Sequence, residues 1–512
     1  MSPNRRDFIR FVVAGSVAAG CPVDLSLIAQ AQTAVGPTLD SEENTICHQV
    51  RDGKVFARPP ASSKNDVVVV GGGVSGLTAA YLLRDRDFLL LEKEPHWGGN
   101  AYMMDYQGAS YATGSAFLTE DESTYSFSKE IGLTPLPVEN WDGSVVNGEF
   151  VPDTWGVGLD NLPYSPTVRE GFKKFKKEIL AIDLEKRATE LFNVPFSDLM
   201  KGHPDEIKLW WDAYCPSNWG ASSDETAAAV GAYELQGMGG DKRKDERYTW
   251  PGGLGTITKK LSEILQAKFA DRLQTGATII AVVQGKEDVQ VTYMQGPELK
   301  TVTAKAVIMA TPKFITRRIV EGLPDKQSEA MQQIRYAPYP VVNLIYDKVV
   351  FDKGYDTWCP GNSFTDMIVA DWVVRHQPDY KRKFNVISCY TPLPEGDRLR
   401  LLTESGAKKV ASKVLKDFQK LMPTTNVDPL EVHVYRRGHP MFMVTPGLFT
   451  NVQPVVRAPM DRIFFANTDS EGPVSTTSGG INAAERAVNE VKARLAGKPL
   501  PKEKQQPVIS GF

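Results

Sequence analysis

Three glycines that follow a short apolar run constrain the fold of this chain more than any other feature. Residues 66–70 form a β-branched run typical of a strand buried in a parallel sheet, and residues 75–84 are expected to be helical. Gly71, Gly73 and Gly76 lie where the strand gives way to the helix. The first glycine allows a tight turn, the second lets the main chain approach a diphosphate, and the third permits close helix packing. The pattern therefore predicts a Rossmann-type βαβ unit that binds a dinucleotide.

The expected second strand, residues 88–91, supports this interpretation. Glu92 ends that strand about twenty residues after the glycines, where a carboxylate can accept hydrogen bonds from both ribose hydroxyls. The amino end of the helix would present free amides and a partial positive charge to the phosphates. The residues assigned to the dinucleotide in this unit are Gly71, Gly73, Val74, Ser75, Gly76, Glu92 and Lys93. They leave open whether the ligand is FAD or NAD.

Several later segments, in a fixed order, favour FAD. They are the pair Gly98-Gly99 followed by Asn100, the stretches 250–254, 276–279 and 306–312, and the C-terminal runs 462–469 and 479–487. With the glycine motif they resemble the flavin-containing amine oxidoreductase superfamily over about residues 65–490. This superfamily includes protoporphyrinogen oxidases, phytoene desaturase-like enzymes and polyamine dehydrogenases. Asn100 stands where the superfamily usually has an arginine. Residues 466–469 are Ala-Asn-Thr-Asp in place of the commoner Ala-Gly-Asp, and this variant is similar to that of spermidine dehydrogenase-like flavoproteins.

The resemblance implies a second set of contacts to FAD, near the diphosphate, the adenine, the ribityl chain and the flavin. It assigns Gly98, Gly99, Asn100, Ile279, Ala310, Thr311, Asn467, Thr468, Asp469, Gly480 and Ile481 to the cofactor.

The fold class expected is α/β, or α+β overall: a Rossmann-type FAD-binding domain with an inserted substrate domain of mixed sheet and helices. A chain of 512 residues exceeds what one core usually organises. The expected division is a signal peptide (1–31), an N-terminal arm (32–64), three parts of the FAD-binding domain (65–120, 251–315, 456–495), an inserted helical region (121–250), a substrate domain with a sheet (316–455) and a tail (496–512).

Hydrophobic patterning predicts the remaining elements. Helices are expected over 168–182, 186–200, 206–214 and 405–421, a three-stranded meander over 279–283, 289–293 and 302–309, and a second group of strands over 341–346, 367–374, 385–390 and 432–435.

Candidates for the substrate site are few. Trp219, Tyr248 and Trp250 could form aromatic walls, and His439 could orient substrate or move a proton. The alternative is that the aromatic residues are core and that His439 is a loop residue beside a proline. Many amine oxidases of the superfamily place an aromatic residue in the C-terminal glycine segment, whereas residues 474–478 are Val-Ser-Thr-Thr-Ser here. An aromatic cage at this position is therefore not expected.

The main functional hypothesis is oxidation of an amine or polyamine by hydride transfer to N5 of FAD. A flavin desaturase acting on a C–C bond of an apolar substrate shares the scaffold, and a flavin-bearing electron-transfer or binding protein without its own substrate is a third possibility. The electron acceptor is either oxygen or a periplasmic acceptor such as a cytochrome.

The N-terminus predicts export. Arg5 and Arg6 precede an apolar stretch, residues 11–21, that is too short to span a bilayer, and residues 29–31 provide a small-x-small cleavage pattern. This resembles a twin-arginine signal, which implies the twin-arginine translocase as a partner and a periplasmic location. Lipidation at Cys21 is not expected. Because that route carries folded proteins, it suits a protein that first loads a cofactor.

Charge and cysteine usage exclude other classes. The net charge of −3 gives no basic field, so nucleic acid is not an expected partner. Later segments do not reach transmembrane length. The five cysteines form no CxxC pair, so no metal site is expected, and the four beyond residue 21 are either free thiols or members of one or two disulfides.

Overall fold

The glycine motif joins the first two strands of a parallel sheet, as the sequence predicts. The computed structural model describes residues 37–120, 122–240 and 246–501. β2 (Ser63–Val70), α4 (Val74–Leu82) and β3 (Phe88–Leu91) form the βαβ unit, with β2 and β3 parallel. β2 begins three residues earlier than expected because its first residues pair with Val302–Ala304. The predicted Rossmann-type unit is therefore confirmed.

The sheet that contains this unit has the strand order β11-β3-β2-β14-β13-β12-β15, and β23 also pairs with β14. Its further strands are β11 (Leu273–Gln274), β12 (Ala277–Gln284), β13 (Val289–Gln295), β14 (Glu298–Met309), β15 (Val320–Glu321) and β23 (Ile463–Phe465). β12, β13 and β14 form the expected antiparallel meander. The carboxyl half of β14 runs parallel to β2, so the meander strand returns the chain to the βαβ unit.

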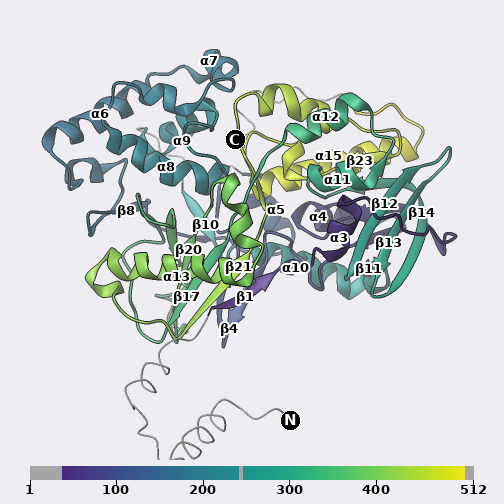
Figure 1. Cartoon of the computed structure of the whole chain (residues 1–512), viewed down its shortest axis with the longest axis horizontal. Helices are drawn as coiled ribbons and strands as arrows, with labels where there is room; N and C mark the ends of the chain where they lie inside the picture. Colours follow the sequence, from purple (N-terminus) through teal and green to yellow (C-terminus); the bar gives the residue numbers. More distant parts are fainter. Residues whose placement is uncertain (1–36, 121, 241–245, 502–512) are drawn as a thin grey trace, which may run out of the picture.

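Successive side chains of the buried strands point to opposite faces of this sheet, and both faces are apolar. Val67, Val69 and Leu90 pack in one core with α4, α10 (Gly255–Phe269) and α15 (Thr477–Leu495), which lie together in Figure 1. Their neighbours Val68, Val70 and Leu91 belong to the other main core.

A second sheet has the order β1-β21-β17-β20-β19-β18-β8-β9. Its strands are β1 (Thr38–Ser41), β8 (Gly143–Val146), β9 (Glu149–Val151), β17 (Val341–Tyr346), β18 (Asp356–Trp358), β19 (Asp366–Val369), β20 (Asn385–Tyr390) and β21 (Glu431–Arg436). α13 (Glu404–Leu421) covers one face through Val414 and Phe418, as its apolar stripe predicts (Figure 1).

Two expectations for this sheet are wrong. The strand expected over 367–374 ends at Val369, because the chain turns there and buries Asp371 against Arg382. The N-terminal arm, for which no regular structure was expected, contains β1 and α3 (Thr45–Arg51) in its described part. β1 is held by parallel pairing with β21, a distant strand, so its own side-chain pattern gives no signal.

A group of helices lies at the upper left of Figure 1: α6 (Pro166–Leu180), α7 (Leu184–Leu191), α8 (Asp205–Trp219) and α9 (Ala228–Gly239). The prediction of a single helix over 186–200 is wrong. It divides into α7 and a 3₁₀ segment, Phe196–Met200, since Pro195 cannot continue a helix from the preceding turn. β8 and β9, from the region expected to be helical, join the second sheet.

The remaining elements are short or connect these layers. They are α5 (Ser123–Glu130), α11 (Lys313–Ile319), α12 (Asp325–Gln333), α14 (Gln453–Val456), β4 (Met103–Tyr106), β5 (Ala109–Ala112), β6 (Leu118–Thr119), β7 (Leu136–Pro137), β10 (Arg247–Thr249), β16 (Tyr336–Ala337) and β22 (Met441–Phe442).

The cysteines of the described chain, Cys47, Cys215, Cys359 and Cys389, are unpaired, and the last three are buried. In the same part of the chain, no helix combines the length and apolarity needed to cross a membrane. The predicted signal segment lies outside the described residues.

Candidate active site

A cavity of about 850 Å³ connects the carboxyl ends of β2, β3 and β14 with the second sheet. At one end it is lined by Val70, Leu91 and Ala310, and at the other by residues of β18, β19 and β20. Ligand cavities generally have volumes of a few hundred to about 1,000 Å³, and they occur where parallel strands end.

Two glycine turns meet at the first end. Gly71 has φ +105°, and a Cβ added at Gly99 would lie 3.0 Å from the Cα of Gly73. A Cβ on Gly76 would lie 1.7 Å from the carbonyl oxygen of Gly71, so the start of α4 fits against the turn only with glycine there. Gly73 is the N-cap of α4 and no side chain caps the helix. The first amides of α4 thus remain available to an anion.

Glu92 lies at the end of β3, as predicted, and lines the cavity. Its carboxylate accepts hydrogen bonds from the amides of Gly72, at 2.5 Å, and Glu94, at 2.8 Å. Burial raises the pKa of Glu92, and these two amides partly offset that effect. Lys93 also lines the cavity and donates to the carbonyl of Glu43 in the N-terminal arm.

Gly72 was not predicted as a site residue, yet the close packing around it requires a glycine. A Cβ at this position would lie 2.5 Å from the ring of Trp97 and 2.9 Å from the Cβ of Glu92. Its amide also fixes the carboxylate of Glu92. The middle glycine of the triplet therefore positions the acidic residue.

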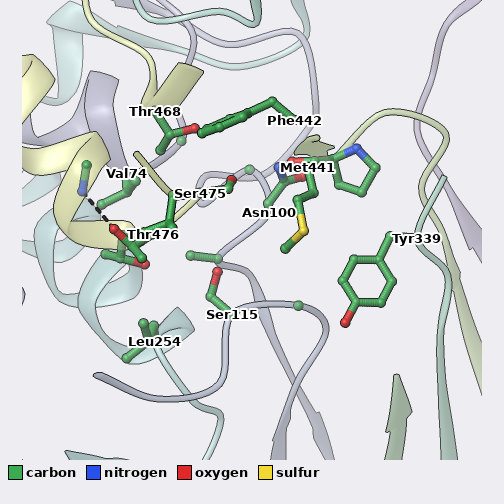
Figure 2. A pocket seen from close by; sticks show the side chains of 18 of the residues that line it. Val74, Asn100, Ser115, Leu254, Tyr339, Met441, Phe442, Thr468, Ser475 and Thr476 are labelled. Atoms are coloured by element: carbon green, nitrogen blue, oxygen red, sulfur yellow. Dashed lines mark hydrogen bonds between the residues drawn. The ribbon is translucent and has the colours of Figure 1, made fainter. Parts of the chain in front are cut away.

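The second glycine pair and Asn100 line the same end of the cavity. The amide of Gly98 donates to the carbonyl of Gly72, at 2.9 Å, which ties the two turns together. The side chain of Asn100 donates to the carbonyl of Pro440 at 2.6 Å, and Asn100 lies beside Met441 in Figure 2. Asn100 thus joins the glycine turn to the loop that follows β21.

Arg437, in that loop, was not expected at the site. It lines the cavity and is 7% exposed. Its Nη1 is 3.4 Å from Glu42, and its Nη2 has no hydrogen-bond partner among the described residues. A buried guanidinium with a free nitrogen needs an acceptor, and a dinucleotide diphosphate is a suitable one. With the glycine cradle, this feature fits FAD.

Most of the residues assigned to the adenine and the ribityl chain lie at the cavity. Ile279, Ala310, Thr311, Asn467 and Thr468 line it. Figure 2 shows Thr468, Val74 and Thr476 gathered on one side of the cavity. The hydroxyl of Thr476 accepts from the amide of Gly479 and caps α15.

Gly480, Ile481 and Asp469 do not line the cavity, contrary to expectation. A Cβ on Gly480 would lie 2.7 Å from Val74, so this glycine lets α15 pack on α4, and Ile481 belongs to the core between them. Asp469 is buried, and its carboxylate binds the Nζ of Lys313 at 2.6 Å. Gly76 likewise contributes to packing and not to the lining.

Asp469 is the centre of a buried polar group. It also accepts from the amide of Lys313 at 2.8 Å and from the hydroxyl of Tyr336 at 2.6 Å. Burial lowers the pKa of Lys313, although the charge of Asp469 opposes that shift. The group holds the start of α11 against the loop after β23.

Of the four predicted substrate-site residues, only Trp219 lines the cavity. The indole of Trp250 donates to the carbonyl of Thr134 at 2.8 Å and belongs to a core cluster, and Tyr248 packs against the same cluster. The ring of His439 packs at a tilt against Phe314 with ring centroids 4.7 Å apart, and burial, aided by Arg398, lowers the pKa of His439 to about 4. These three residues therefore do not line the cavity, and their assignment to the substrate site stays a prediction.

Other aromatic residues form the far part of the cavity. Tyr339 precedes β17 and Tyr390 ends the neighbouring strand β20, so both line the cavity from the same end of this strand pair, with ring centroids 6.1 Å apart. Figure 2 shows Tyr339 across from Ser115. Ser217 hydrogen-bonds the hydroxyl of Tyr339 at 2.7 Å, and the carbonyl of Gly114 accepts from Tyr390 at 2.6 Å. The rings are therefore fixed in place. Burial raises the pKa of both phenols, so they stay neutral.

A Rossmann unit, two glycine turns and an aromatic part of the same cavity, called the chamber below, define the class of protein: an oxidoreductase that binds a dinucleotide beside a cavity for its substrate. The sequence profile of the family described as "Flavin containing amine oxidoreductase" matches residues 74–492. The chain belongs to this family. It is accordingly an FAD-dependent oxidoreductase.

Similar proteins agree with that assignment. Flavin-containing amine oxidase A of Equus caballus is 25% identical over 480 residues, covering 86% of each chain. Oxidoreductase PigB of Serratia sp. is 22% identical and covers 85% of this chain and 76% of its own. Two solved structures share the fold: putrescine oxidase bound to putrescine (TM-score 0.64, 16% identity) and cyclohexylamine oxidase from Brevibacterium oxydans (TM-score 0.65, 18% identity). Each similarity covers 84% of this chain and 99% of the solved chain.

Two glycine variants separate cofactor binding from folding. In Gly73→Val the Cβ meets only the Cα of Gly99, at 3.8 Å, so we expect a folded but colourless protein whose side chain fills the diphosphate space. Gly76→Ala places a methyl group on the carbonyl of Gly71, so both fold and colour should be lost. Flavin absorbance and circular dichroism measure the two effects. Gly396→Val, where no atom lies within 4 Å of the new Cβ, is the control. A yellow Gly73→Val protein would contradict the assigned site.

Removal of the Asp469 carboxylate should lower stability and not cofactor affinity. Asp469→Ala leaves the buried ammonium of Lys313 unpaired, so the free energy of unfolding should fall by about 3–5 kcal/mol. Denaturant unfolding measures this change, and Glu404→Ala, which removes an exposed pair with Lys408, should have little effect. A variant that keeps its stability and loses FAD would show that Asp469 contacts the cofactor.

Proposed function

We propose that this chain oxidises an amine or polyamine, with FAD bound along the glycine turns. One observation carries the proposal: a single cavity is lined by Gly71, Gly73 and Gly99 and also by the fixed rings of Tyr339 and Tyr390. When bound, FAD accepts a hydride at N5 from the carbon next to the amine nitrogen.

The chain's own residues bind and orient in this scheme. Gly71, Gly73 and the amides of α4 would hold the diphosphate together with Arg437, and Glu92 would hold the ribose. Tyr339, Tyr390 and Trp219 would exclude water and align the carbon that loses hydride. The neutral phenols can donate hydrogen bonds and do not act as bases. No side-chain nucleophile is needed for this chemistry.

An amine substrate is favoured over an apolar one. The cavity contains the buried acidic side chains of Asp356 and Asp366, and an apolar substrate would leave Oδ1 of Asp356 without a hydrogen-bond partner. The amine oxidases among the similar proteins support the same substrate class. Residues 474–478 supply hydroxyl and aliphatic groups to the cavity wall, so the chamber differs from an aromatic cage at that position.

Anaerobic mixing with amines tests the proposal. The purified yellow protein is combined with alkylamines and diamines without oxygen, and the flavin absorbance near its visible maximum is followed. We expect rapid bleaching and, after turnover, an aldehyde with ammonia or a shorter amine. If no amine bleaches the flavin, the proposed activity is wrong. Hydrogen peroxide formed after air is admitted would identify oxygen as acceptor, whereas a lack of peroxide would favour a periplasmic acceptor.

We also propose export to the periplasm through the twin-arginine translocase, on the basis of Arg5, Arg6 and the apolar stretch that follows. Replacement of both arginines by lysine should leave the full-length, FAD-loaded protein inside the cytoplasm, as cell fractionation would show. Export of the double variant at the normal rate would contradict the proposed route.

A further inference from the structure

The floor of the chamber is one face of the second sheet. Residues that are directly opposite each other on neighbouring strands share a face, and the pairs Tyr390–Asp366 and Asp366–Trp358 form such a row. The next row on the same face, two residues along each strand, pairs Ile368 with Asp356. All five side chains line the cavity, so the register places two carboxylates on its floor.

These carboxylates differ in their partners. One oxygen of Asp366 accepts from the hydroxyls of Ser217 and Thr365, both at 2.6 Å. Oδ2 of Asp356 accepts from Arg247 at 2.9 Å. Oδ1 of Asp356 has no hydrogen-bond partner among the described residues, although Asp356 is only 2% exposed. A buried, unpartnered carboxylate oxygen on a cavity wall indicates that a ligand supplies the missing donor.

The charge balance indicates the sign of that ligand. Arg247 also binds Asp142, at 2.8 Å, so one guanidinium is shared by two carboxylates and Asp366 has no basic partner within hydrogen-bond distance in the described chain. Burial raises the pKa of Asp366 to about 7 and also raises that of Asp356, as expected for acids that lack sufficient positive charge. A cation at this position would restore the balance.

The walls suit an alkylammonium ion. Tyr214 and Trp358 lie with ring centroids 4.4 Å apart, and both line the cavity. Aromatic faces attract cations and also pack against methylene groups. A substrate carboxylate is disfavoured, because Arg247 is already bound by two acids.

We infer that Asp356 and Asp366 bind the distal ammonium of a substrate with two cationic nitrogens, while the carbon beside its other nitrogen is oxidised. The substrate class is thus a diamine or polyamine. The inference rests on the proposed amine oxidation and specifies which amines are the preferred substrates. Asp356 and Asp366 position the substrate and take no part in hydride transfer.

The test compares α,ω-diamines with n-alkylamines of the same carbon number. Anaerobic stopped-flow measurements on the FAD-loaded protein give the dissociation constant of each amine and its limiting rate of flavin reduction. Asp366→Asn and Asp356→Asn should raise the dissociation constant of the preferred diamine by about 10- to 100-fold, since a hydrogen bond to a charged group is lost. The dissociation constants of the monoamines should rise by a clearly smaller factor, because a monoamine has no second ammonium to bind these residues.

Asp371→Asn is the matched control. Asp371 is also buried and hydrogen-bonds Arg382 and Tyr380, but it does not line the cavity. It should leave the preference for diamines unchanged. Flavin absorbance confirms that each variant is folded, and Asp366→Asn carries the test if loss of the Arg247 contact prevents Asp356→Asn from folding.

The outcomes are distinguishable. Loss of diamine affinity in the Asp366 or Asp356 variant, with monoamine affinity retained, supports the inference. Equal affinity for both amine classes in the unaltered protein, or equal loss for both in the variants, overturns it and leaves amine oxidation intact. A preference for α-amino acids would also overturn it, because the chamber would then bind a carboxylate. Failure of every amine to bleach the flavin would overturn the proposed function as well.

Discussion

The close approach of main chain to main chain at the two glycine turns determines where everything else in the site lies. Gly76 meets the carbonyl of Gly71 at a separation that excludes any side chain, and Gly99 makes a looser but still tight contact with the Cα of Gly73. This contact brings the start of α4 to the cavity and leaves its first amides unbound. Gly72 in turn fixes Glu92, so backbone geometry places both the first amides of α4 and this carboxylate at the cavity.

Elements whose pattern is local could be predicted from the sequence. β3, β17 and β20 match their expected bounds, and α13 differs by one residue, because their side chains repeat with the period of a buried strand or an amphipathic helix. β1 could not be predicted, since it owes its existence to pairing with β21 almost four hundred residues later. The division of the chain into cofactor and substrate segments stays a prediction.

The site follows the same rule. The positions of Gly71, Gly73 and Glu92 on the cavity could be predicted because conformational freedom and strand position are encoded within a short segment. Asp356 and Asp366 could not, since only the register of β18 against β19 shows that they share a face. Trp250 and His439 carry side chains suited to catalysis, yet tertiary packing turns both away from the cavity. A sequence motif shows the conformation of a short segment of backbone. The chamber is formed by strands that are distant in sequence, so a motif cannot show which of their residues line it.

The pairing of β1 with β21 also affects how the chain reaches its native state. Leu39 lies opposite Val434, so the edge of the second sheet is completed only after most of the polypeptide has been synthesised. Contacts between such distant segments slow folding, and until they form the backbone groups along β21 remain open to other chains. The edge of the second sheet is therefore completed by a contact that joins an amino-terminal segment to a carboxyl-terminal one.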